Sequence, residues 1–442
     1  MSSTTDRLFI RRRLDNGLTV LMRPSRAAPV TSFWIWYRVG SRNEPEGLTG
    51  ASHWVEHMLF RGTPRFPRGA VHRLIAREGG IRNGMTSFDF TCYFETLPSD
   101  RVEIALEIEA DRMVNAQFTS EAVEAERTII LSERAGSENR PMWRLHEAVN
   151  KAAFGSHPYG HPVIGWREDL ERITRDQLYE HYRTYYAPNQ AIVAIAGDFD
   201  PDRMLERVDA HFGGIDRSAG SRYDPPRPDP PQDLTRVTIT GEERTRYVLI
   251  AFPAPSAAEE DYIPLLLADC VLGGAPAMAL FGARAIPSRS SRLYRSVVEG
   301  DLAARASSNL RFSVDPSLFT ISATARPDAD PEQLEAALWR EVDRITTEPI
   351  TADELSRARR QLQAAFAYSS ESVTNQAFWL GYSEAVVRAE WFSGFMDAVA
   401  RVTADDILRV ASKYLRRDRA VVGWYHPEGG DSRPLSAHPD AS

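Results

Sequence analysis

The chain has 442 residues, of which 43% are hydrophobic and 26% charged, with a formal net charge of −8. This is the composition of a soluble globular protein with ample material for a large core. The negative charge and the lack of a long basic run argue against nucleic acid as a partner.

Two further features bear on location. No stretch approaches the roughly 20 apolar residues that a membrane span needs, and the N-terminal sequence lacks the apolar run of a secretory signal. The two cysteines, Cys92 and Cys270, lie far apart in the sequence and do not suggest a disulfide framework. A reducing compartment fits this cysteine usage, and we expect a cytoplasmic protein that does not bind membranes.

The first predicted elements are strands over residues 17–22 and 31–37, which are rich in β-branched and aromatic side chains. A helix is predicted over residues 48–60. It places His53, Glu56 and His57 on one face, and its other faces carry Trp54, Val55, Met58 and Leu59. Because the helix is apolar nearly all round, we expect it to be buried.

Polar side chains on a buried helix need partners, since desolvating them is costly. A metal ion is one partner that satisfies two imidazoles four residues apart, and a catalytic zinc site uses three protein ligands and a water. Glu56 lies beside His57, where it can take a proton from that water. This H-x-x-E-H order is the inverted form of the zinc-protease motif. The alternative is a pair of core histidines bonded to the backbone.

Residues 121–134, EAVEAERTIILSER, contain two candidates for a third ligand. Glu126 and Glu133 are seven residues apart on one face of a predicted helix, with Ile129 and Ile130 between them. Seven residues span about 10 Å of helix, so we do not expect both carboxylates to bind one ion. Either one is a ligand and the other supports it, or neither takes part.

The chain repeats a helix–strand unit. Residues 172–193 and 401–422 align without a gap, matching Thr174 with Thr403 and Tyr185 with Tyr414. Each copy begins with a Thr that can cap a helix and ends in a β-branched run. Between the copies, the proline-dense residues 218–234 predict an extended linker.

This organisation predicts two related domains, 1–217 and 235–442, joined by the linker 218–234. The second half also opens with strand-like material, at residues 235–240 and 246–252. We therefore expect an α+β fold in which each domain is a mixed β-sheet covered by helices on one face. The second half has no H-x-x-E-H, so only the first carries a candidate metal motif.

These motifs together resemble the inverzincin metallopeptidases of the pitrilysin, insulysin and mitochondrial processing peptidase group, family M16. After His57 the chain continues MLFRGT, as the family does. Residues 157–165, HPYGHPVIG, and 185–200, YYAPNQAIVAIAGDFD, also match. The resemblance is strong over most of the first half and weak over the second, where it rests on the repeat and on SRLY at 291–294.

The resemblance implies one Zn²⁺ per chain, held by His53, His57 and Glu133, with Glu56 as the catalytic base and Glu126 as an auxiliary acid. It also implies an edge strand beside the zinc, within residues 79–93, that binds a peptide substrate by strand addition. The family usually has Asn-Ala in that strand, whereas this chain has Asn83 and Gly84.

Short members of the family work in pairs, as two chains that enclose an unfolded peptide. Many carry an Arg and a Tyr in the C-terminal half that hold the substrate near the zinc. This chain has Val298 and Ala304 at those positions, and neither Arg295 nor Arg305 is at the family position. We therefore expect a zinc endopeptidase subunit whose related partner supplies the Arg and Tyr; the rival is a homodimer that works without them.

A non-catalytic structural or regulatory subunit is the alternative function, because some family members have that role. Such members typically lose a metal ligand or the glutamate. This chain retains all four candidates, namely His53, Glu56, His57 and Glu133, which favours an enzyme.

Overall fold

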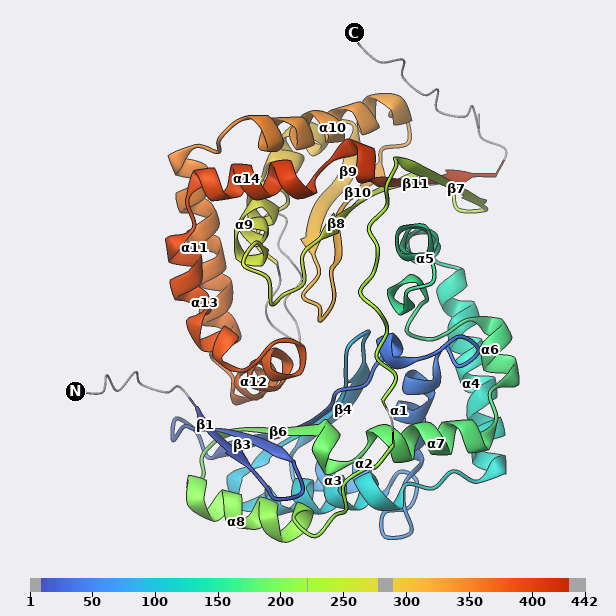
Figure 1. Ribbon diagram of the computed structural model, residues 1–442, viewed down its shortest axis with the longest axis vertical. Coiled ribbons are helices and arrows are strands. Elements are labelled where there is room, and N and C mark those ends of the chain that lie inside the picture. Colours follow the sequence, from blue (N-terminus) through green and yellow to red (C-terminus); the bar gives the residue numbers. More distant parts are fainter. Residues whose placement is uncertain (1–8, 221, 277–288, 429–442) are drawn as a thin grey trace, which may run out of the picture.

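The computed structural model describes residues 9–220, 222–276 and 289–428, so the first eight residues of the N-terminal stretch discussed above lie outside it. Its elements surround two β-sheets, one in each half of the chain (Figure 1). The first sheet has the order β1 (Ile10–Arg13), β2 (Thr19–Pro24), β6 (Ala191–Gly197), β3 (Val30–Tyr37), β5 (Thr91–Pro98) and β4 (Ile81–Thr86). Only β2 and β6 pair in parallel, so the sheet is mixed.

The second sheet is also mixed and follows the same plan. Its order is β7 (Thr235–Gly241), β11 (Val421–Pro427), β8 (Tyr247–Ala254), β10 (Ser317–Ala325) and β9 (Ala303–Leu310). Strand β11 lies between a parallel neighbour, β7, and an antiparallel one, β8, as β6 lies between β2 and β3. The predicted α+β class with two related sheets is confirmed.

The repeated unit has the same local structure in both copies. Thr174 caps α7 (Arg175–Tyr185) and Thr403 caps α14 (Ala404–Tyr414). In each, the Thr side chain accepts a hydrogen bond from the backbone N–H three residues on, and the side chain there, Gln177 or Asp406, bonds back to the Thr N–H. This reciprocal cap fixes the start of each helix, and a sheet strand, β6 or β11, follows.

Both faces of each sheet are covered, whereas helices on one face were expected. The strand β3 shows why: Phe33 and Ile35 pack into one apolar cluster, and Trp34 and Trp36 into another on the opposite face. A strand with large apolar residues at every position must be buried on both sides. Helix α12 (Val373–Val386), from the second half, covers the second face, and Trp34 and Trp36 both pack against its Phe378.

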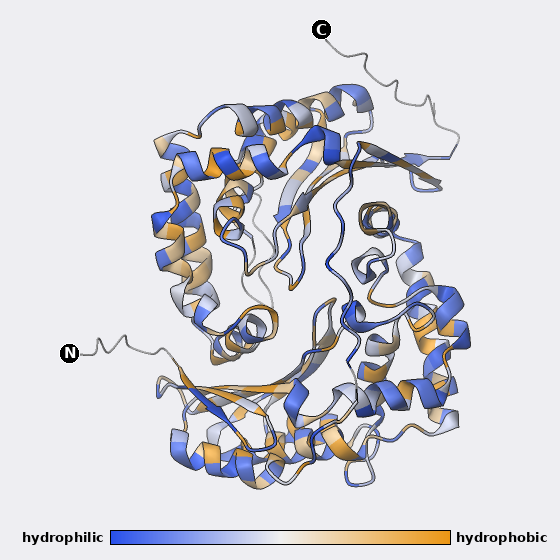
Figure 2. Cartoon of the chain, in the orientation of Figure 1, coloured by the Kyte–Doolittle hydropathy of each residue, from blue (hydrophilic) through white to orange (hydrophobic). Residues whose placement is uncertain are grey.

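The exchange is reciprocal, because helix α5 (Pro141–Phe154) of the first half packs on the second sheet against β7, β8 and β11 (Figure 1). The other described helices are α1 (Ala51–Arg61), α2 (Ala70–Arg77), α3 (Glu103–Asn115), α4 (Ser120–Glu138), α6 (Arg167–Arg172), α8 (Pro201–Phe212), α9 (Tyr262–Leu272), α10 (Pro331–Thr347), α11 (Ala352–Ser369) and α13 (Glu390–Arg401). Most of these helices are hydrophobic on the side toward the core and hydrophilic on the outer side (Figure 2). Among the described helices, none has the length and apolar character to cross a bilayer.

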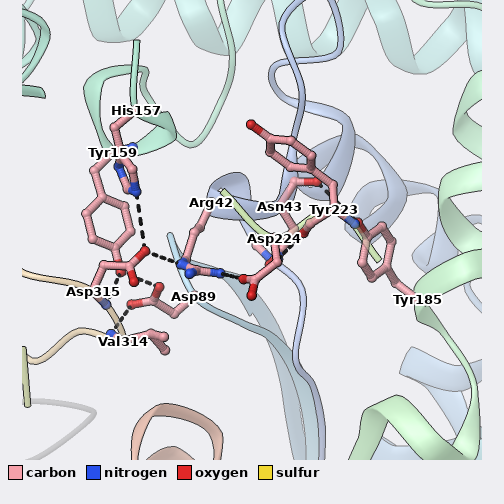
Figure 3. Close-up of polar contacts among 11 residues, drawn as sticks. Arg42, Asn43, Asp89, His157, Tyr159, Tyr185, Tyr223, Asp224, Val314 and Asp315 are labelled. Atoms are coloured by element: carbon pink, nitrogen blue, oxygen red, sulfur yellow. Dashed lines mark hydrogen bonds and ion pairs between the residues drawn. The ribbon is translucent and has the colours of Figure 1, made fainter. Parts of the chain in front are cut away.

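A polar network joins the two halves and the linker around Arg42 (Figure 3). The buried guanidinium of Arg42 binds Asp224 of the linker. It also binds Asp315, which lies between β9 and β10. Asp315 also accepts a hydrogen bond from His157, and its N–H donates to the hydroxyl of Tyr159. The described part of residues 218–234 is neither helix nor strand.

Candidate metal centre

The helix that carries the two histidines, α1, begins at Ala51 and not at residue 48. Gly50 has a left-handed φ of 91°, which is readily open only to glycine. The buried carboxylate of Glu44 accepts hydrogen bonds from the N–H groups of Gly50 and Ser52, each at 2.7 Å. These contacts satisfy backbone donors at the first turn and so fix where the helix starts.

Burial of α1 sets the direction of its polar face. Trp54, Val55, Met58 and Leu59 are at most 2% exposed and pack in the apolar cluster under the first sheet. The side chains of His53 and His57 are 16% and 20% exposed. The apolar faces therefore hold the helix while the two imidazoles reach the surface of the core.

Helix α4 packs across α1 and brings Glu133 to the histidines. A Glu133 carboxylate oxygen lies 3.9 Å from Nε2 of His53 and 3.6 Å from Nε2 of His57. The two imidazole centroids are 4.5 Å apart. Among the described residues, this trio is the group of at least three His, Cys, Asp or Glu side chains whose ligand atoms converge closely enough for a metal ion.

These separations suit a zinc ion. Ligands at about 2.1 Å from a tetrahedral zinc lie about 3.4 Å from one another. The observed 3.6 and 3.9 Å are close to that value and exceed ordinary hydrogen-bond lengths. Burial lowers the pKa of His53 to about 3, and nearby His57 adds to the effect, so the His53 ring is neutral, as a metal ligand must be.

Glu126 lies on the other side of the His57 ring from Glu133. Its carboxylate is 2.8 Å from Nδ1 of His57 and also contacts Nε of Arg61. Burial opposes ionisation, but the bonds to His57 and Arg61 outweigh it and lower the pKa of Glu126. An ionised Glu126 keeps the proton of His57 on Nδ1, which leaves Nε2 facing Glu133.

Glu56 is 8% exposed, and one of its carboxylate oxygens accepts a hydrogen bond from the hydroxyl of Thr86 at 2.8 Å. Burial raises the pKa of Glu56, while the bond from Thr86 opposes the rise. A carboxylate that holds a proton more readily than usual is suited to both accepting and returning one.

Thr86 ends β4, which is the edge strand of the first sheet. Asn83 and Gly84 lie in its middle, and Asn83 is exposed. A Cβ atom at Gly84 would come within 2.8 Å of the Phe60 ring, so the glycine lets β4 lie close to α1. The structure therefore places β4, the strand predicted to bind substrate, beside α1, with one edge unpaired within the described chain.

The positions that would hold the substrate Arg and Tyr lie elsewhere. Val298 ends a short helical turn, and Ala304 is exposed on β9 of the second sheet. Arg295 and Arg305 are exposed in the same two elements. The helical turn packs on β9 and α10, and Figure 1 shows β9 and α1 in separate parts of the molecule.

Three supporting residues were missed at the sequence level: Glu44, Arg61 and Thr86. Thr86 had a usable signal, because alternation along a strand puts it on the same face as Gly84. Glu44 and Arg61 had none, because their partners are set by how α1 meets the loop before it and by how α4 crosses it.

Comparison with protein-family models gives two matches of one family. Residues 19–166 match the model described as insulinase, peptidase family M16. Residues 172–362 match the model described as peptidase M16 inactive domain. The two matches are adjacent and together cover most of the chain.

Known relatives agree with these matches. The chain is 28% identical over 418 residues to an uncharacterized zinc protease of Streptomyces coelicolor, covering 92% of this chain and 87% of the relative. It is 27% identical over 435 residues to the mitochondrial-processing peptidase subunit beta of Lentinula edodes, covering 94% and 90%. The crystal structure of a protease from Helicobacter pylori has the same fold, with a TM-score of 0.88 at 23% identity over 95% of this chain and 99% of that one.

Proposed function

This chain belongs to the M16 family of peptidases, and we propose that it is a zinc metalloendopeptidase that hydrolyses peptides or unfolded polypeptide segments. One observation carries the proposal: Glu133 faces Nε2 of both His53 and His57, while Glu56 lies on the same helix face at the edge strand β4. A candidate metal site, a candidate proton acceptor and an open backbone edge meet at one place.

His53, His57 and Glu133 would hold the zinc, with one ion per chain. When bound there, zinc supplies a Lewis acid that lowers the pKa of a water and polarises the scissile carbonyl. Glu56 takes the proton from the attacking water and passes it to the leaving amine, so one water is consumed for each peptide bond broken. Thr86 orients the carboxylate of Glu56 for both transfers.

Substrate would bind to β4 as an added strand. An unpaired sheet edge offers backbone N–H and C=O groups to any extended peptide, so recognition depends mainly on the backbone. Asn83 and Gly84 lie at the centre of this edge. Such binding requires an unfolded segment, which favours peptides over folded proteins as substrates.

We further propose that the active form is a dimer with a related M16-type subunit. The support is that Val298 and Ala304 stand where many members carry Arg and Tyr. A partner would bring those side chains to the zinc from outside the chain. Native mass measurement of the enzyme purified from its source tests this: a homodimer fully active on peptides contradicts the heterodimer.

Metal content is the first test. Elemental analysis of the purified chain should give about one zinc per chain, and the Glu133→Ala variant should lose it. Glu124→Ala is the matched control, because Glu124 is exposed on the same helix and its side chain bonds Arg127, away from the histidines. Absence of zinc in the wild type after zinc is supplied would contradict the ligand set.

The role of Glu56 separates an enzyme from a non-catalytic subunit. Glu56→Gln should bind zinc normally and cleave unstructured peptides at a rate reduced by at least about a thousandfold. A wild-type chain that cleaves no peptide, even with any partner that co-purifies, would favour a non-catalytic structural or regulatory subunit. Cleavage by Glu56→Gln at the wild-type rate would contradict Glu56 as the catalytic base.

A cytoplasmic location is also proposed. Both cysteines, Cys92 and Cys270, are buried and free, and free thiols persist in reducing compartments. Cell fractionation with an antibody to the chain tests the location directly.

A further inference from the structure

The edge strand β4 carries an arginine in the row of side chains that faces helix α1. Alternation places Arg82, Gly84 and Thr86 on one face of the strand. Thr86 bonds Glu56, and Gly84 lies against Phe60 of α1. Arg82 is therefore the next side chain in this row, and the four residues from Thr86 to Arg82 span about 13 Å of strand.

The position of this arginine is set by an aromatic ring. The Cζ atom of Arg82 lies 5.0 Å from the ring centroid of Phe60, and the Cζ of Arg112 lies 5.3 Å from the same centroid. Such stacking holds a guanidinium in place while leaving its N–H groups available. Arg82 is half-buried, so part of the residue is exposed at the sheet edge.

Arg82 lacks the ion pair that its neighbours could provide. Glu95 is its registered partner on β5, yet no carboxylate in the described ranges lies within 4.0 Å of a guanidinium nitrogen of Arg82. Its Nε is buried without a hydrogen-bond partner. The other nearby acid, Glu109, pairs with Arg112 at 3.1 Å.

The two acids near this guanidinium, Glu95 and Glu109, act on it only from beyond ion-pair distance. Burial and the adjacent Glu109 raise the pKa of Glu95 well above its ordinary value, which favours the uncharged form of this acid. Burial and repulsion from Arg112 lower the pKa of Arg82, but an arginine stays protonated in a protein. A positive charge with a buried, unbonded N–H therefore lies at the open edge of the sheet.

The direction of an added peptide follows from the sheet. Because Thr86 bonds Glu56, the scissile bond would lie at the Thr86 end of β4. A segment that pairs antiparallel with β4 runs from Thr86 toward Ile81, so its residues after the scissile bond pass Arg82. Side chains directly opposite one another in such a pair lie on the same face. The planar fork of an arginine matches a carboxylate through two parallel hydrogen bonds.

We propose that Arg82 binds a carboxylate of the substrate within the first four residues after the scissile bond, so that the enzyme prefers peptides acidic on that side. The inference rests on the proposed peptidase function, because it assigns specificity within the same site. The carboxylate is either an Asp or Glu side chain or the C-terminus of a short peptide, and both present the same chemistry to the guanidinium.

The test uses unstructured synthetic decapeptides that the zinc-loaded enzyme, with any co-purifying partner, cleaves. Glu and Gln are compared at each of the four positions after the cleaved bond, and peptides ending in an acid are compared with amides. The wild type should show a kcat/KM about tenfold higher for a carboxylate at one position. In Arg82→Gln this ratio should fall to about one, and in Arg82→Glu a Lys peptide should become the better substrate.

Arg12→Gln is the matched control, because Arg12 is exposed on β1, the opposite edge strand of the same sheet. It should keep the wild-type ratio. A preference confined to acid over amide termini supports the proposal and identifies the terminus as the source of the carboxylate. Equal rates on all matched peptides, or a preference that persists in Arg82→Gln, overturns it while peptidase function stands. Failure to cleave any peptide overturns the proposed function itself.

Discussion

The carboxylate of Glu126 lies 2.8 Å from Nδ1 of His57, and the carboxylate of Glu133 lies 3.6 Å from Nε2 of the same ring. One imidazole thus lies between two acids of one helix, seven residues apart. The seven-residue spacing puts the two carboxylates on opposite sides of the ring: Glu133 faces Nε2, the candidate metal-binding atom, and Glu126 bonds Nδ1.

The metal affinity should depend on pH through His57. Burial opposes its charged form, but the acids Glu126, Glu56 and Glu133 raise the pKa of His57 above its ordinary 6.5. Zinc must displace that proton, so the apparent affinity should fall as pH drops through the His57 pKa, by about tenfold per pH unit below it. Competition titration with a zinc chelator measures this. It should cover about pH 5 to 8, the range in which histidines ordinarily change charge.

Glu126→Gln should change that profile. Loss of the negative charge should weaken zinc binding at pH about 8 by between about tenfold and a hundredfold, and should move the onset of proton competition to lower pH. Glu124→Gln, on an exposed position of the same helix, should behave as the wild type. Identical profiles for Glu126→Gln and the wild type would contradict a role for Glu126 behind His57.

Gly381→Ala should weaken the contact between the two halves. Gly381 lies on α12 against Trp36 of β3, where a Cβ would come within 1.9 Å of the indole Nε1. Overpacking of this kind costs about 1–3 kcal/mol, measurable by urea unfolding. Gly394→Ala is the control, since nothing lies within 4 Å of its Cβ position on helix α13; it should stabilise by up to about 1 kcal/mol. Equal effects would contradict the close approach.

The two acids that bind Arg42 should contribute unequally to stability. Asp315 is 13% exposed and Asp224 is 70% exposed, while Arg42 is 5% exposed. Asp315→Asn should cost about 3–5 kcal/mol because the buried Arg42 guanidinium loses its one largely buried acid among the described residues and keeps only the exposed Asp224. Asp224→Asn should cost at most about 1 kcal/mol. Urea unfolding at neutral pH measures both, and similar costs would show that the network around Asp315 is not the stabilising one.

The contribution of the Asp315–Arg42 pair to the free energy of unfolding should depend on pH. Burial opposes ionisation of Asp315, but His157 and Arg42 outweigh burial and lower its pKa below the ordinary 3.8. A depressed acid pKa stabilises the fold above the ordinary pKa, and the contribution is lost as pH falls through the lower folded value. The stability difference between wild type and Asp315→Asn should therefore shrink below pH about 4, and a difference constant in pH would contradict this.

Removal of the Glu44 carboxylate should destabilise the first turn of α1. Glu44→Ala leaves the N–H groups of Gly50 and Ser52 without acceptors, at a cost of about 1–3 kcal/mol for each buried group. We expect a lower free energy of unfolding and weaker zinc binding. Glu46→Ala, two residues on and exposed, should change neither; a matching loss in both variants would argue against the cap.

Much of this protein follows from short-range patterns. The helical face of His53, Glu56 and His57 depends only on residue spacing, and a Thr that caps a helix acts on its own backbone. The repeat around Thr174 and Thr403 is of the same kind, so two related mixed sheets could be predicted without knowledge of tertiary contacts. The motif and its continuation also indicated the M16 family.

What only the tertiary structure decided concerns groups that meet across the fold. Spacing left open which of Glu126 and Glu133 faces Nε2 of both histidines, because that depends on the angle at which α4 crosses α1. The exchange of α5 and α12 between the halves was not predicted, since apolar strands such as β3 require a cover on both faces but do not identify it. The unpaired charge of Arg82 arises from a ring, a neighbouring strand and a helix that are distant in sequence, and electrostatic environment is set by distance in space.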